Sequence, residues 1–227
     1  MTIAERLAEV RARIDRAAAA SGQDPAHVKL LAVSKTKGAE AVREAYAAGQ
    51  RAFGENYAQE LADKAAALAD LTELEWHFIG HLQTNKARVV ARHAHVVHTI
   101  DSTALARELG KRVTREGRPT PLPVLIEVNI GGEAQKAGAS PGDLDEVMRA
   151  VQASDALALR GLMTMPPAGD LLRARQVFET LATLRNLHGG PAVLPELSMG
   201  MSDDLEIAVA CGATIVRVGS AIFGPRT

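Results

Sequence analysis

The feature that most constrains the fold is an alternation, repeated eight times along the chain, of a short strand-like run with a helical segment. The strongest runs cover residues 28–34 and 124–129. They are apolar, bounded by polar residues and too short for helices, so each is predicted to be a buried strand. The other predicted strands are 51–54, 75–79, 95–99, 157–163, 196–198 and 214–218. Alternating strands and helices favour a parallel sheet, and eight such units indicate a closed (β/α)8 barrel, an α/β fold.

An open, doubly wound sheet would use the same units. Its dinucleotide-binding fingerprint, Gly-x-Gly-x-x-Gly after a strand, is missing, and the sequence has no Walker-type phosphate loop. We therefore expect one barrel domain over residues 1–227, without an internal repeat or a linker.

Capping residues predict where several helices begin. Thr2 and Glu5 form a capping box that starts an amphipathic helix ahead of the first strand. Ser102 is predicted to cap one later helix and Ser140 another, with Pro141 at the first helical position of the latter. The barrel should therefore carry an extra amino-terminal helix.

The charge and residue composition excludes several classes of partner. Lys and Arg number 26 and Asp and Glu 27, a formal net charge of −1, so no strong positive field attracts nucleic acid or an anionic membrane. The amino terminus has no basic stretch before an apolar one, and no segment offers about 18 uninterrupted apolar residues, so neither export nor membrane insertion is expected. The single cysteine, Cys211, excludes an internal disulfide and fits a cytoplasmic protein. No apolar stripe beyond the core demands a partner, and we expect a monomer.

Lys35 is the first candidate for chemistry, because reactive groups in a barrel lie where strands end. It directly follows the 28–34 strand, which would point its amine across the barrel mouth. If Lys37 and Arg217 lie near, their like charge would favour the neutral amine, the form that condenses with an aldehyde. The alternative is a solvated lysine that only closes a strand.

Two glycine-containing segments, 197–204 and 214–220, contain the ends of the last two predicted strands, where barrels frequently bind phosphate. Gly219 permits close approach of the backbone, and Ser198 and Ser220 offer hydroxyl groups. This chemistry suits a phosphomonoester. The alternative is ordinary loop chemistry, with Ser202 as a helix cap.

Arg217 and Asn56 also lie at predicted strand ends. A buried guanidinium requires an anion or an acceptor, and either a pyridine nitrogen or a structural salt bridge to Glu127 would satisfy Arg217. Asn56 could hydrogen-bond a ligand or only its own turn.

The histidines at 93, 95 and 98 do not predict a metal site. A strand through them would place His93 and His95 on one face and His98 on the other, without a cysteine or carboxylate at ligand spacing. We expect structural or solvated roles for them and no metal.

Several segments together resemble the pyridoxal phosphate homeostasis protein family over nearly the whole chain. They are 31–37 (LAVSKTK), 53–57 (FGENY), 77–86, 128–138, 161–165 (GLMTM), 198–202 (SMGMS) and 216–224 (VRVGSAIFG). The resemblance implies a barrel similar to the amino-terminal domain of alanine racemase, which binds pyridoxal 5′-phosphate (PLP) as a Schiff base on Lys35. It also implies that Arg217 faces the pyridine nitrogen and that Asn56 lines the ring. The phosphate contacts that it implies are Ser198 and the backbone amides around Met199, Gly219 and Ser220.

The same resemblance implies a non-catalytic protein of PLP homeostasis that binds the cofactor reversibly and passes it to apo PLP-dependent enzymes. An arginine beside the ring leaves it a weak electron sink, which agrees with this function. Only seven residues follow Ser220, so we expect no carboxyl-terminal domain that supplies a second base. The alternatives are a PLP-dependent amino acid racemase or lyase, and a barrel that binds another phosphorylated metabolite.

Overall fold

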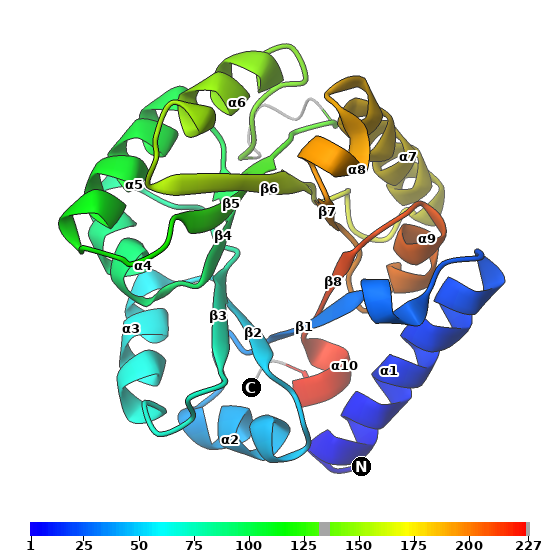
Figure 1. Ribbon diagram of the computed structural model, residues 1–227. Helices are drawn as coiled ribbons and strands as arrows, with labels where there is room; N and C mark the ends of the chain where they lie inside the picture. The colour runs from blue at the N-terminus through cyan, green and yellow to red at the C-terminus, as the bar shows by residue number, and fades with distance from the viewer. Residues whose placement is uncertain (132–136, 226–227) are drawn as a thin grey trace.

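The structure is a computed structural model that describes residues 1–131 and 137–225. Within them, eight parallel strands close into a barrel in chain order, as predicted. The strands are β1 Lys29–Val33, β2 Ala52–Glu55, β3 Glu75–Phe78, β4 Val96–Ile100, β5 Leu122–Glu127, β6 Leu157–Met163, β7 Glu196–Ser198 and β8 Ile215–Val218. Helices surround the ring of strands (Figure 1). The segment 128–138 noted in the sequence lies partly outside the described residues.

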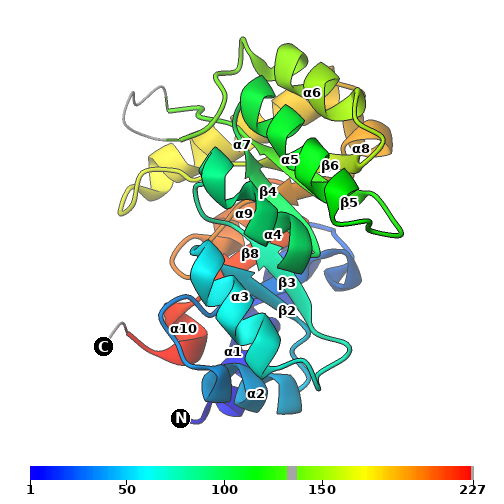
Figure 2. The ribbon, with the colours of Figure 1, turned by 90° about the vertical axis from the view of Figure 1, so that its left-hand side faces the viewer.

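The helices fill the connections between strands. They are α1 Ile3–Ala20, α2 Ala39–Ala47, α3 Ala58–Ala67, α4 Ala87–His93, α5 Thr103–Arg115, α6 Leu144–Gln152, α7 Leu171–Leu187, α8 Gly190–Val193, α9 Leu205–Ala210 and α10 Ser220–Phe223, with short 3-10 turns at Pro25–His27 and Thr84–Lys86. The extra helix α1 packs outside the ring against α9, α10 and α2. Seen from the side, α10 and the carboxyl terminus lie toward the left of the molecule (Figure 2).

Two of the predicted caps are confirmed. Thr2 Oγ1 accepts the Glu5 amide at 3.2 Å while Glu5 Oε2 accepts the Thr2 amide at 2.8 Å, which completes the capping box. Ser102 Oγ accepts the Leu105 amide at 3.3 Å at the start of α5.

The predicted cap at Ser140 is wrong, and Ser202, considered as a helix cap only in the alternative to a phosphate site, does not cap a helix either. The Asp143 amide donates to both the carbonyl and the hydroxyl oxygen of Ser140, so residues 140–143 form a separate turn and α6 begins only at Leu144. Ser202 likewise lies ahead of α9, which begins at Leu205. The turn before α9 is instead closed by Asp204, whose Oδ1 accepts the Met201 amide at 2.6 Å.

The barrel interior is unusually polar. Alternate residues of each strand point inward, and a barrel is commonly filled there by branched apolar side chains. Here a small apolar cluster, separate from the main core between strands and helices, contains Leu31, Ala52, Ile79 and Ile215. Buried polar side chains of the strands include His77, His98, Glu127, Ser198 and Arg217. Because burial of polar groups is costly, each of these needs an explanation.

Among residues 1–131 and 137–225, no helix is both long and apolar enough to cross a lipid bilayer.

Candidate functional site

A pocket of about 300 Å³ lies where the first and last barrel strands end. Its lining includes Lys35, Asn56, Arg217, Gly219 and Ser220, so five of the seven residues singled out in the sequence come together. The remaining lining residues are Val33, Thr36, Lys37, Ile79, Met165, Met201, Ser202, Asp203, Phe223 and Gly224.

Lys35 lies two residues beyond β1, and both of its neighbours are anchored. Ser34 Oγ donates a 2.6 Å hydrogen bond to Glu55 Oε1, and the Thr36 amide donates a 2.8 Å bond to Glu60 Oε2. Thr36 has a φ of 62°, which is costly for a β-branched residue and persists only where its surroundings enforce it. The backbone that presents Lys35 is therefore held in a defined conformation.

The buried ammonium of Lys64 joins these two anchors. Its Nζ donates to the Ser34 carbonyl and to Glu55 Oε1, both at 2.7 Å, and to Glu60 Oε2 at 3.1 Å. Burial raises the pKa of Glu55, and the hydrogen bonds from Lys64 and Ser34 oppose that shift. This network uses all three ammonium protons to support the segment that carries Lys35.

Arg217 is buried at the end of β8, with 4% of its surface exposed. Its Nη1 donates to Ser198 Oγ at 2.8 Å and its Nη2 to the Thr164 carbonyl at 3.0 Å. Burial lowers the pKa of Arg217 to about 10, so the guanidinium stays charged at neutral pH.

The salt bridge to Glu127 considered as a structural role for Arg217 is not formed, and no other carboxylate of the described residues lies within ion-pair distance of this guanidinium. Burial raises the pKa of Glu127 to about 7, an effect that the charge of Arg217 only partly offsets. The positive charge of Arg217 is therefore not neutralised by a direct carboxylate contact.

Another wall of the pocket is the turn that enters α10. Gly219 lies against β1, where a Cβ would stand 3.2 Å from the Val33 carbonyl oxygen. Ser220 Oγ donates to Ser202 Oγ at 3.3 Å. The first amides of a helix have no partner within it, so this turn offers N–H and O–H donors to an anion.

Ser198 and Met199 do not line the pocket. The Ser198 hydroxyl is fully buried, where it accepts from Arg217 and contacts His98 Nδ1 at 2.9 Å. The Met199 amide donates to the Ile215 carbonyl at 3.1 Å and is thus used inside the barrel. These two residues lie beneath the pocket, and a direct contact of either with a phosphate group does not follow from this geometry.

One polar atom of Asn56, a residue that lines the pocket, finds no partner in the described part of the protein. Its Oδ1 is buried without a hydrogen-bond partner among the described residues. The backbone of Asn56 is fixed by Gly80, where a Cβ would stand 1.9 Å from the Asn56 carbonyl oxygen. An unsatisfied buried acceptor of this kind fits a ligand that supplies a donor.

The charges of the described lining residues favour an anion. Lys35, Lys37 and Arg217 are cationic, and Asp203 is the carboxylate among them. Lys37 Nζ donates to the Pro225 carbonyl at 2.8 Å on the exposed side of the pocket. A negatively charged ligand of small size is the chemistry that this arrangement suits.

The three histidines considered for a metal site have separate roles. His95 Nδ1 accepts the Trp76 amide at 2.9 Å, whereas His98 is fully buried against His77 and Ser198. His93 ends α4 and is partly exposed. Among the described residues no group of three potential ligands is positioned for a metal ion.

Sequence reasoning missed several residues of the site. Met165, Met201 and Phe223 supply apolar contacts, and Glu55 with Lys64 supports Lys35 from behind. The only sequence signal for Lys64 was its place three residues after Leu61, on the buried face of α3.

The fold and the pocket define a barrel of the alanine racemase amino-terminal type, and the family model described as alanine racemase, N-terminal domain, matches residues 6–227. The pyridoxal phosphate homeostasis protein of Pseudomonas aeruginosa PAO1 is 51% identical over 227 residues, 99% of this chain and 96% of that protein. The protein of the same name from Escherichia coli K12 is 47% identical over 231 residues, 99% of this chain and 97% of that protein. The chain belongs to the pyridoxal phosphate homeostasis protein family.

Solved structures agree with this assignment. PipY of Synechococcus elongatus PCC7942 with PLP bound has a TM-score of 0.85 and 40% identity, covering 98% of this chain and 100% of that one. Alanine racemase from Corynebacterium glutamicum has a TM-score of 0.67 and 20% identity over 99% of this chain and 63% of that one, a similarity of fold alone.

Proposed function

We propose that this chain binds PLP covalently through Lys35 and acts as a carrier of the cofactor rather than as an enzyme. The observation that carries the proposal is that Lys35, Arg217, Gly219 and Ser220, from opposite ends of the chain, line one pocket. The PLP-bound structure of PipY and the name of the Pseudomonas aeruginosa relative support it.

The residues of the pocket fit PLP. Its volume of about 300 Å³ lies at the lower end of the range for small-molecule sites. Cationic side chains and the donors at Gly219 and Ser220 suit the phosphate group, and Asn56, whose Oδ1 is unsatisfied, belongs to the same lining. Ser198, by contrast, would act indirectly, through the orientation of Arg217.

Lys35 would supply the covalent link. Its neutral ε-amine would form a C–N link to the aldehyde carbon of PLP, and the aldehyde oxygen would leave as water with the two amine protons. Arg217 would donate a hydrogen bond to the pyridine nitrogen and keep it unprotonated.

The proposal of a carrier is supported by the positions of the two tyrosines, which could otherwise serve as a catalytic base. PLP as an electron sink supports many reactions, but a racemase or lyase also needs a placed acid or base. Tyr46 stacks under Arg51, 4.0 Å from the guanidinium carbon to the ring centroid, and Tyr57 is 56% exposed. Neither tyrosine belongs to the described lining of the pocket.

We propose that the protein is a monomer in the cytoplasm and that it releases the bound cofactor to apo PLP-dependent enzymes.

The test of the covalent site is reductive trapping. The protein is incubated with PLP, reduced with borohydride and digested, and mass spectrometry locates the added pyridoxyl group. We expect it on Lys35, and we expect Lys35→Ala to lose the visible absorption band while Lys111→Ala on α5 keeps it. Trapping on another lysine would reject the assignment, and a wild-type protein without a visible band would favour a different phosphorylated metabolite.

The racemase or lyase alternative is tested separately. The PLP-loaded protein is incubated with each proteinogenic amino acid, and enantiomers and products are followed over many equivalents. We expect no sustained turnover, and repeated turnover of any amino acid would reject the carrier proposal.

A further inference from the structure

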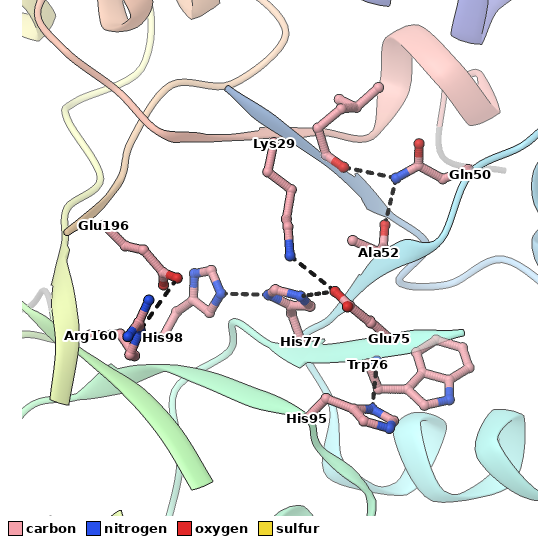
Figure 3. Close-up of polar contacts among 11 residues, drawn as sticks. Lys29, Gln50, Ala52, Glu75, Trp76, His77, His95, His98, Arg160 and Glu196 are labelled. Carbon is pink, nitrogen blue, oxygen red and sulfur yellow. Dashed lines mark hydrogen bonds and ion pairs between the residues drawn. The ribbon is translucent and has the colours of Figure 1, made fainter. Parts of the chain in front are cut away.

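A line of polar side chains runs through the barrel from Arg217 at one end to Glu75 at the other. Arg217 Nη1 lies 2.8 Å from Ser198 Oγ, Ser198 Oγ lies 2.9 Å from His98 Nδ1, and His98 Nε2 lies 2.8 Å from His77 Nδ1. His77 Nε2 then lies 3.5 Å from Glu75 Oε2, an electrostatic contact without hydrogen-bond geometry, and Lys29 Nζ donates to the same oxygen at 3.0 Å. Figure 3 shows His98, His77, Glu75 and Lys29 following one another across the interior.

The two ends of this line have fixed chemical roles. A guanidinium can only donate hydrogen bonds, and an ionised carboxylate can only accept them. The contact with His77 and the ammonium of Lys29 lower the pKa of Glu75 to about 2, so Glu75 is ionised at neutral pH.

The chemistry of Arg217 and Glu75 determines which atom carries each proton between them. Burial lowers the pKa values of His77 and His98, so both imidazoles are neutral and each has one donor and one acceptor. Because His77 Nε2 faces a carboxylate, it carries the proton and Nδ1 accepts from His98 Nε2. His98 Nδ1 must then accept the proton of the Ser198 hydroxyl, whose oxygen in turn accepts from Arg217.

The same direction follows from the other end. Since Arg217 can only donate to Ser198, the hydroxyl proton is available for His98. The three hydrogen bonds from Arg217 to His77 and the electrostatic contact of His77 Nε2 with Glu75 therefore favour the same arrangement of protons, and such chains are strengthened by mutual polarisation.

We propose that Ser198, His98 and His77 are positioning residues that fix the orientation of Arg217 toward the cofactor pocket. The inference rests on the proposed function for the identity of the ligand. The bonds to Ser198 and to the Thr164 carbonyl occupy one N–H of each terminal nitrogen and leave the other donors of Arg217 for the pocket that it lines.

The arrangement also explains why the interior is polar. A carboxylate directly beside Arg217 would hold the same orientation but would neutralise its charge. The chain instead places the carboxylate at the far end of the barrel, with neutral groups between, so the guanidinium keeps its full donor strength toward the pocket. Apolar side chains of similar volume would fill the space without orienting Arg217.

The first test needs no cofactor. Long-range nitrogen–proton NMR of the ligand-free protein at neutral pH reports the tautomer of each histidine. We expect His77 and His98 to be neutral and protonated on Nε2, and we expect Ser198→Ala to perturb the His98 Nδ1 resonance. A proton on Nδ1 of either ring, or a charged ring, would overturn the proposal.

The second test measures the effect on the ligand. His98→Leu removes both hydrogen bonds, and we expect the dissociation constant for PLP to rise about tenfold, or about 1.4 kcal/mol, and the pH profile of the visible band to shift, because Arg217 loses its fixed orientation. His98→Asn keeps an acceptor near the position of Nδ1 and should recover most of the affinity. His95→Asn is the matched control, since His95 accepts the Trp76 amide outside the chain, and it should leave the binding of PLP and the pH profile unchanged.

Wild-type affinity and an unshifted pH profile in both His98→Leu and Ser198→Ala would reject the positioning function. If His98→Leu does not fold, Ser198→Ala alone decides, because it removes one hydroxyl from the same chain. Failure of PLP to bind the wild-type protein would reject the proposed function and leave the tautomers measured without ligand unaffected, so the two failures are distinguishable.

Discussion

Lys64 and Glu55 form a buried ion pair, with 2.7 Å between Nζ and Oε1, next to Ser34, which directly precedes Lys35 in the chain. Neither side chain lines the pocket, and 8% of the Lys64 side chain and none of the Glu55 side chain is exposed. The pair contacts the segment that carries Lys35 through the carbonyl and the hydroxyl group of Ser34.

The first prediction concerns this pair. Lys64→Met leaves the buried Glu55 carboxylate without its cation, and we expect it to lower the free energy of unfolding by about 3–5 kcal/mol. Equilibrium urea denaturation checks this. Lys111→Met on the exposed face of α5 is the control, with an expected change within about 0.5 kcal/mol. A double variant, Lys64→Met with Glu55→Gln, should be more stable than the sum of the single changes predicts, and strict additivity would mean that the two groups do not interact.

Much of the fold could be predicted because the alternation of strands and helices depends on local patterns alone. The first and last residues of the strands could not be predicted in this way. The predicted strand began at residue 124, whereas β5 begins at Leu122 and pairs Pro123 with Ala158 of β6, although proline is rare inside a sheet. The pairing with β6 in the closed barrel sets this start of β5, and local sequence patterns do not report that pairing.

For the candidate site, the positions of residues at strand ends were predictable, but the directions of their side chains were not. Lys35, Arg217, Gly219 and Ser220 follow from the rule that barrel sites lie at strand ends. Ser198 also lies at a strand end, but its hydroxyl points inward to His98, and that direction depends on the register of β7 in the closed sheet. Lys64 was missed because a lysine within a helix is ordinarily solvated.

The second prediction concerns Gly80. A Cβ at this position would overlap the carbonyl oxygen of Asn56, at 1.9 Å, so the backbone of one of the two segments must move. We expect Gly80→Ala to destabilise the protein by roughly 2–4 kcal/mol and to weaken PLP binding, because overpacking displaces Asn56 from the pocket. Thermal unfolding and a PLP titration check the two effects. Gly142→Ala, whose nearest neighbour atom would be 3.7 Å away, should change neither, and an unaffected Gly80→Ala variant would contradict the close packing.

The third prediction is a dependence of stability on pH at Glu127. Its pKa in the folded protein is about 7, above the ordinary value of 4.5, so the folded state binds more protons than the unfolded state between these two values. Stability contributed by this group is therefore present below pH 4.5 and is lost as the pH rises toward 7, by about 3 kcal/mol in total.

Glu127→Gln tests this dependence. Its free energy of unfolding should fall less steeply than that of the wild type between pH 4.5 and 7, and the variant should be the more stable of the two at pH 8. Urea denaturation at several pH values measures both curves. Parallel curves would show that Glu127 titrates normally. Glu146→Gln on the exposed side of α6 serves as the control for the loss of one carboxylate.

The fourth prediction separates the phosphate contacts from the rest of the site. Ser220 lines the pocket with a hydroxyl that can donate to a phosphate oxygen, whereas the Ser198 hydroxyl bonds Arg217 and His98 among the described residues. A hydrogen bond to a charged group is worth about 1.5–3 kcal/mol, so Ser220→Ala should weaken PLP binding by about tenfold or more and leave the binding of pyridoxal, which lacks the phosphate, almost unchanged. Ser198→Ala should weaken both ligands by a similar factor, since it acts through Arg217. Titration of the visible band with each ligand gives the two ratios, and an equal loss of both ligands in Ser220→Ala would place the phosphate elsewhere in the pocket.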